Sequence, residues 1–155
     1  MILYHGTNVE FDTIDLAKSK PNKDFGQGFY LTADYEQALA MARIKMEQLE
    51  FGEPLVLTYE VDEELMKSLK TLHFNEYSEE WAKFIFKNRN RDYNFTHDFD
   101  IVIGPIANDG VAYLLGRYEE GTLTIEELSD KLDFKKLNSQ YFFGTNKSLK
   151  YLKRL

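Results

Sequence analysis

The sequence contains no cysteine, has only 3 prolines among 155 residues, and has no apolar run long enough to cross a membrane. The lack of cysteine excludes disulfide bonds and thiolate metal sites, and it favours a reducing compartment. The N-terminal stretch lacks the basic segment and apolar run of a signal peptide. With no Pro/Gly-rich linker and no repeat, we expect residues 1–155 to form a single cytoplasmic domain that has no membrane partner.

Positive charge is in short supply, because the formal net charge is −7. This balance argues against non-specific binding to duplex nucleic acid, which depends on Lys and Arg. The segment 134–155 is the exception, since it has six basic residues and no acidic one. It is interpreted either as a solvated face or as a patch that attracts an anionic cofactor or substrate. Its basic residues are Lys135, Lys136, Lys147, Lys150, Lys153 and Arg154.

Apolar patterns and capping signals predict a mixed α+β fold. Strands are expected over 2–7, 28–32, 54–61, 99–106 and 139–145, and a surface loop over 8–24. Helices are expected from 34 to about 49, from 78 to about 89, over 110–118, over 124–132 and over 147–152, with Asp34, Ser78 and Thr124 at three of the starts. Strands and helices do not alternate strictly, which favours α+β over a doubly wound sheet.

Three segments stand out by their chemistry and their order: Tyr-His-Gly-Thr at 4–7, Gly-Gln-Gly-Phe-Tyr-Leu-Thr at 26–32, and Gln-Tyr-Phe-Phe at 140–143. Each taken alone favours a structural role. A single His is usually a structural hydrogen-bonding group, a Gly-x-Gly is usually a turn, and a Tyr in an apolar strand is usually core.

Together, the three segments resemble the ADP-ribosyltransferases of the diphtheria-toxin and poly-ADP-ribose polymerase branch. A closer resemblance is to a bacterial family of this superfold, and it covers essentially the whole chain. The resemblance implies an ADP-ribosyltransferase-like fold, with mixed central β-sheets and flanking helices. It rests on residues 3–7, 24–32, 37–38, 78–81, 99–105 and 137–140, which match the family pattern in order.

The resemblance also implies an NAD site. The backbone of Gly6 would hold the nicotinamide carboxamide, His5 would bind a ribose hydroxyl, and the Tyr30 ring would stack on nicotinamide. Phe29 alternates with Tyr30 along the strand and should face the core. The resemblance gives His5, Tyr30 and Gln140 as the catalytic residues, and His5, Gly6, Thr7, Gly28, Tyr30 and Asp109 as the NAD-binding residues.

Gln140 stands where related branches carry a glutamate. A glutamine can accept a hydrogen bond from a ribose hydroxyl, but it brings no charge against the cation that builds on the sugar as the glycosidic bond breaks. Asp100 and Asp109 are the other carboxylates considered, although Asp109 is also interpreted as a helix cap and Asp24 as a turn residue. The family often has a Trp where Met41 lies here, so a second stacking ring is absent.

The sequence patterns around the remaining candidate residues favour structural roles. His73 and His97 have no metal-ligand spacing and are interpreted as surface residues, so no metal site is expected. Trp81 follows helical apolar spacing and is interpreted as core.

The sequence thus favours an NAD-dependent mono-ADP-ribosyltransferase, toxin-like, in a bacterial cytoplasm. NAD would be the co-substrate, and the acceptor would be a protein or a single-stranded nucleic acid. An inhibitor or antitoxin protein is a further partner that the resemblance allows. Two alternatives stay open: a catalytically inactive NAD-binding or protein-interaction module, and a relative that uses NAD to remove a phosphate from RNA.

Overall fold

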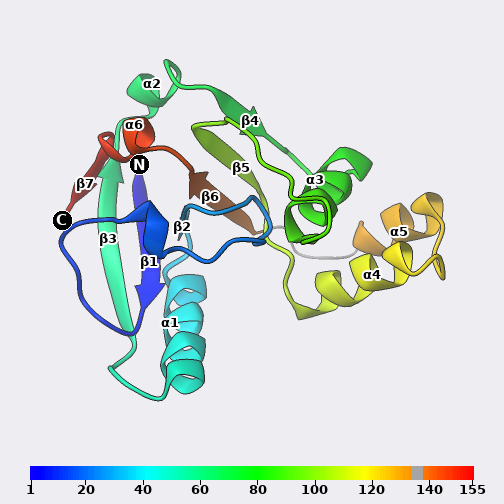
Figure 1. The fold of residues 1–155 in the computed structure, drawn as a ribbon, viewed down its shortest axis with the longest axis horizontal. Helices are drawn as coiled ribbons and strands as arrows, with labels where there is room; N and C mark the ends of the chain where they lie inside the picture. Colours follow the sequence, from blue (N-terminus) through cyan, green and yellow to red (C-terminus); the bar gives the residue numbers. More distant parts are fainter. Residues whose placement is uncertain (134–137) are drawn as a thin grey trace.

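The computed structural model describes residues 1–133 and 138–155, without the side chains of Leu65 and Asp109. The described residues form a seven-stranded mixed sheet with flanking helices, so the α+β prediction is confirmed (Figure 1). In this sheet the strands run in the order β4-β5-β6-β2-β1-β3-β7. Neighbouring strands are antiparallel except for the parallel pair β4–β5. The strands are β1 Ile2–Thr7, β2 Phe29–Thr32, β3 Leu55–Val61, β4 Thr71–His73, β5 Ile101–Pro105, β6 Ser139–Phe143 and β7 Leu152–Arg154.

The helices begin at capping side chains, largely as predicted. Asp34 and Ser78 accept backbone N–H groups of the first turns of α1 and α3, and Thr124 forms a reciprocal capping box with Glu127 at the start of α5. The helices are α1 Tyr35–Leu49, α2 Glu63–Met66, α3 Glu79–Arg89, α4 Asp109–Glu119, α5 Ile125–Leu132 and α6 Asn146–Leu149, and a 3-10 turn (η1) covers Leu16–Lys18.

Two predictions of local structure were wrong. Asn108, not Asp109, caps α4, because the Asn108 side chain accepts the N–H of Val111 at 3.1 Å while Asp109 is already the first helical residue. The helix expected over 147–152 ends at Leu149, and residues 152–154 form strand β7, whose Leu152 pairs with Val61 of β3. A distant strand, which no local pattern reveals, decides that ending.

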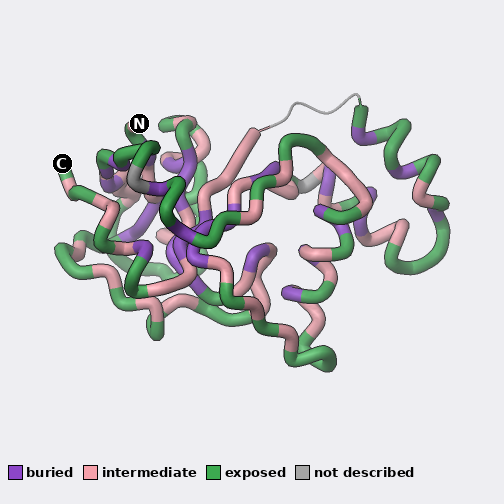
Figure 2. The backbone as a smooth tube through the Cα atoms, turned by 90° about the horizontal axis from the view of Figure 1, so that it is seen from above, coloured by how far each residue is buried: buried purple, intermediate pink, exposed green. Residues whose placement is uncertain are grey.

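The core has one part on each face of the sheet. On one face, Val102 of β5 and Phe142 of β6 pack with buried residues of α3, α4 and α5. On the other face, Leu3, Phe29, Leu57 and Phe143 pack together with residues of the α2 region. Buried segments accordingly gather in the interior of the molecule, and exposed residues follow its outer turns (Figure 2). Phe29 and Trp81 are buried, as predicted.

Helix α1 covers the β1 end of the face that α3 to α5 cover at the β5 end. Gly6 and Tyr4 contact this helix, since a Cβ at Gly6 would meet Ala38 and Ala42, and the Tyr4 ring lies 5.4 Å from that of Tyr35. Figure 1 shows α1 beside β1 and well apart from α4 and α5. No helix within the described residues is long and apolar enough to span a membrane.

Candidate functional site

Strands β1 and β2 separate after a single residue pair. Their register joins Tyr4 with Thr32, whereas β1 and β3 stay paired from Ile2 to Thr7. Residue 1 and Val61 exchange backbone hydrogen bonds, so the alternation of antiparallel pairs turns the N–H and C=O of Tyr4 and Gly6 toward β2. Continued by two residues, the register would place Gly6 opposite Tyr30. The backbone groups of Gly6 therefore face the opening between the two strands.

The His5 side chain bridges this opening. Its Nδ1 lies 2.7 Å from the carbonyl oxygen of Tyr30, the group that a continued ladder would offer to Gly6. Because a carbonyl can only accept, Nδ1 carries the proton and Nε2 is left as an acceptor. Burial and the nearby ammonium group of Lys45 lower the pKa of His5 to about 3, although the bond to Tyr30 opposes them. The imidazole is therefore neutral near pH 7, and its ring stacks on Phe29 at 4.2 Å.

Gly6 has a structural reason to be glycine. A Cβ at this position would overlap the carbonyl oxygen of Ala38 and would approach the backbone nitrogen of Ala42 to 2.8 Å. The carbonyl oxygen of Gly6, part of the backbone expected to hold the nicotinamide carboxamide, accepts a hydrogen bond from Lys45 Nζ at 2.8 Å. Close packing of α1 thus explains the glycine without any ligand, and the carbonyl of Gly6 is hydrogen-bonded to Lys45.

Tyr30 is held at both ends of its side chain. Its hydroxyl donates to Gly26 O at 2.6 Å and accepts the N–H of Phe25 at 3.0 Å, which fixes the loop before β2. Burial raises the pKa of this hydroxyl, so it is protonated. The ring packs edge-on against Phe142 at 5.2 Å, and Lys23 Nζ lies 5.3 Å from the ring centre. The ring is present where a stacking partner was expected, with an ammonium group over it.

Gln140 shares this face of the sheet with Tyr30. It lies opposite Thr32 of β2 and Gly104 of β5, and by strand alternation its side chain points to the same face as Phe142. Its Nε2 is buried and has no hydrogen-bond partner. A buried amide that lacks an acceptor is costly, so an acceptor that reached this donor would remove the cost. The sheet thus places Gly6, Tyr30 and Gln140 on one face of three adjacent strands.

Two lysines that the sequence did not single out lie at this opening. Burial lowers the pKa of Lys45 to about 8, and the charge of Lys23 adds to the effect. Burial also lowers the pKa of Lys23, with a further contribution from Lys20, while Asp24 opposes the shift. The charges of both lysines act on His5 as well. These lysines, drawn from the loop before β2 and from α1, form a cationic pair beside His5.

Three of the predicted NAD-binding residues have other contacts or are not described. The buried hydroxyl of Thr7 donates to Val9 O at 3.0 Å, in a local turn at the end of β1. Gly28 is small because a Cβ there would overlap the ring of Phe142. Asp109 begins α4, and its side chain lies outside the described structure.

The carboxylates of Asp24 and Asp100 stabilise the fold. Asp24 is more than a turn residue, because its Oδ1 pairs with Arg89 of α3 at 2.6 Å and ties the loop before β2 to that helix. Asp100 lies at the opposite end of β5 from Gly104, the residue that pairs with Gln140. It accepts the hydroxyl of Thr145 at 2.7 Å and the N–H of Lys70 at 2.9 Å. Neither carboxylate replaces the charge that Gln140 lacks.

The interpretation of His97 as a surface residue was wrong. Its Nε2 lies 2.6 Å from Phe25 O, its Nδ1 accepts the N–H of Phe99, and its ring packs 5.5 Å from that of Phe142. It therefore fixes the loop that carries Phe25 and Tyr30. His73 is exposed as expected, although it lies in strand β4. Among the described residues, no group of three or more His, Asp or Glu side chains could hold a metal ion.

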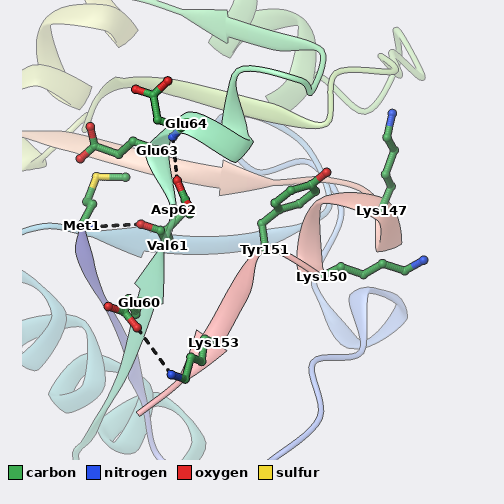
Figure 3. Close-up of a pocket in the computed structure, with 10 residues that line it drawn as sticks. All are labelled: Met1, Glu60, Val61, Asp62, Glu63, Glu64, Lys147, Lys150, Tyr151 and Lys153. Atoms are coloured by element: carbon green, nitrogen blue, oxygen red, sulfur yellow. Dashed lines mark hydrogen bonds and ion pairs between the residues drawn. The ribbon is translucent and has the colours of Figure 1, made fainter.

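Two surface hollows lie away from these residues. One, of about 400 Å³, is lined by four aromatic rings and two lysines of the α3–α4 region. The other, of about 870 Å³, lies where β3, β7 and α6 meet (Figure 3). Lys153 turns toward Glu60 there at 3.8 Å, while Lys147 and Lys150 extend on the side away from Glu63 and Glu64. This hollow mixes charges rather than forming a cationic patch, and Lys135 and Lys136 lie outside the described residues.

A family model described as "Protein of unknown function (DUF3990)" matches residues 1–154, nearly the whole of the chain. A search among curated proteins finds no match.

Proposed function

The chain belongs to the DUF3990 family, and we propose that it is an NAD-dependent mono-ADP-ribosyltransferase with an ADP-ribosyltransferase-like fold. One observation carries the proposal. Gly6, Tyr30 and Gln140 lie on one face of three adjacent strands, beside the opening between β1 and β2 that His5 bridges. They are among the residues to which the resemblance gives a catalytic or NAD-binding role.

Groups at and beside the opening fit a dinucleotide in three respects, with the His5 ring on the Phe29 face of the sheet and Tyr30 and Gln140 on the other. The neutral His5 ring offers Nε2 as an acceptor for a ribose hydroxyl. Tyr30 offers an aromatic ring that its hydroxyl contacts hold in place. Gln140 Nε2 is a buried donor without an acceptor, and a ribose oxygen would satisfy it. The Gly6 carbonyl fits only if Lys45 gives it up on binding.

NAD, when bound, would supply the activated ribose that is transferred to the acceptor. The protein would hold the ribose through His5 and fix the ring environment through Tyr30. Gln140 would act only as a hydrogen-bonding group. A hydrogen bond to a charged group contributes about 1.5–3 kcal/mol and a neutral one about 0.5–1.5 kcal/mol. Since about 1.4 kcal/mol is tenfold in rate, we expect slow turnover.

The test is transfer of label from NAD tagged on its adenosine into a bacterial lysate. Protein, nucleic acid and released nicotinamide are scored separately for the wild type, Tyr30→Ala and Tyr30→Phe. Tyr30→Phe keeps the ring and removes the contacts to Phe25 and Gly26, so it separates stacking from loop anchoring. Label that is lost in Tyr30→Ala and largely kept in Tyr30→Phe supports the proposal. Equal label in all three proteins contradicts it.

The uncharged Gln140 favours a second candidate, an inactive NAD-binding or protein-interaction module on the same scaffold. This candidate predicts no nicotinamide release from the wild type under any condition. Gln140→Glu is the discriminating variant, because it places a carboxylate beside Thr32 without changing the length of the side chain. Release that appears only in Gln140→Glu supports the module. Release by the wild type rejects it.

A further inference from the structure

We propose that Lys23 and Lys45 form a binding site for a pyrophosphate group at the opening between β1 and β2. The inference rests on the proposed NAD site and names the part of the ligand that these two lysines would hold. It does not depend on cleavage of NAD, because a pyrophosphate-bearing ligand that lacks nicotinamide would use the same two cations.

The first argument is that the ammonium group of each lysine contacts a neutral partner. Lys45 Nζ donates to the carbonyl of Gly6 at 2.8 Å, and Lys23 Nζ lies over the Tyr30 ring. Both residues are half-buried. No ion pair within the described part of the chain includes either lysine. Cations taken from water without a counter-charge are unfavourable, and an anion placed between them would remove that cost.

The second argument is that the carboxylate beside Lys23 is already used. The carboxylate of Asp24 acts to raise the pKa of Lys23, but its Oδ1 lies 2.6 Å from both Nε and Nη2 of Arg89. That pairing holds the loop against α3, and it leaves the lysine pair with a net positive field. His5, which also lies at the opening, is neutral and does not compensate it.

The third argument is placement. Lys45 reaches the opening from α1, whose position is fixed by the close contact of Ala38 and Ala42 with Gly6. Lys23 precedes β2 in the loop that the Tyr30 hydroxyl and His97 anchor. Both lysines therefore extend from backbone that is fixed at the site, and their flexible stems allow the ammonium groups to leave neutral partners for phosphate oxygens.

The experiment measures dissociation constants for ADP-ribose, inorganic pyrophosphate and adenosine by calorimetry. The proteins are the wild type, Lys23→Met, Lys45→Met and Lys131→Met. Methionine keeps most of the apolar stem, and Lys131 is an exposed control on α5. We expect each site variant to weaken ADP-ribose and pyrophosphate about tenfold or more, as for one hydrogen bond to a charged group. Adenosine binding and the Lys131→Met protein should not change.

The salt dependence of ADP-ribose binding is a second measurement. Binding of ADP-ribose to the wild type should weaken with rising salt, and the slope should be smaller in each site variant, since fewer charges are screened. Thermal unfolding of each variant without ligand confirms that it is folded.

Unchanged affinities in both lysine variants would overturn the inference. So would tighter binding in Lys45→Met, because the lysine would then block the Gly6 carbonyl instead of binding the ligand. The two proposals fail separately. ADP-ribose affinity that depends on Lys45, without nicotinamide release, keeps the pyrophosphate site and removes the transferase. Label transfer that depends on Tyr30 and is unchanged in both lysine variants keeps the transferase and removes the pyrophosphate site.

Discussion

Replacing Gly6 with alanine should disrupt the packing of helix α1 against strand β1. A Cβ at this position would overlap the carbonyl oxygen of Ala38 and lie 2.8 Å from the backbone nitrogen of Ala42. These are backbone atoms of a helix, so no side-chain rotation can relieve the clash and the helix must move. Overpacking of this kind costs roughly 1–3 kcal/mol, and we expect about 3 kcal/mol because the obstacle is backbone.

Gly116 is the matched control. It lies inside helix α4, and a Cβ there would meet nothing within 4 Å. Gly116→Ala should stabilise the protein by roughly 0.5–1 kcal/mol, because alanine costs less backbone entropy in a helix than glycine. The same chemical change should thus act in opposite directions at the two positions.

Urea unfolding followed by circular dichroism measures both effects. The loss in Gly6→Ala corresponds to a fall of about 6–12 °C in Tm for a domain of this size. The urea slope should stay constant if only stability changes. An unfolding free energy of Gly6→Ala within about 0.5 kcal/mol of wild type would refute the packing argument. It would then leave ligand contact as the reason for the glycine.

Two further predictions concern acid. Burial, and to a smaller extent the charge of Lys45, lowers the pKa of His5 to about 3. Below about pH 6.5 the His5 side chain is therefore protonated in the unfolded chain but not in the folded chain. Stability from this group is therefore complete above about pH 6.5 and falls by up to about 1.4 kcal/mol per pH unit below it. His5→Gln should flatten the pH dependence of the urea midpoint between pH 7 and pH 5, and an unchanged slope would contradict the assignment. Burial alone would raise the pKa of Asp100, but bonds from Thr145 and Lys70 outweigh it and lower the pKa. Its stabilisation is then present above about pH 3.9 and lost as the pH falls through the lowered pKa. Asp100→Asn should cost about 1–3 kcal/mol at pH 7 in the same assay, and the gap to wild type should narrow in acid.

Features that depend on local sequence were predictable. Asp34, Ser78 and Thr124 cap the helices that their patterns indicated, because a cap and its partners lie within three residues. Phe29 and Tyr30 point to opposite faces because alternation along a strand is a local property.

Features decided by distant contacts were not. Strand β7 exists because β3 offers an edge to Lys153 and its neighbours. His97 is half-buried because Phe25 O and four aromatic rings surround it. The alternation of Phe95, His97 and Phe99 was the one available signal. No local pattern indicated that Lys23 and Lys45 lie close together, because their proximity depends on where α1 packs.

The position of β6 in the sheet has a consequence for synthesis of the chain. Residues 139–143 lie between β5 and β2, and the order of strands makes β6 the link between the two parts of the sheet. A nascent chain that has reached only β5 therefore has β1, β2 and β3 on one side and β4 and β5 on the other, without the strand that completes the sheet between them. Such non-local pairing is slow to form and exposes strand edges until it does. Gln140, which lies opposite Thr32 of β2, would thus take its place in the sheet late, after most of the polypeptide has left the ribosome.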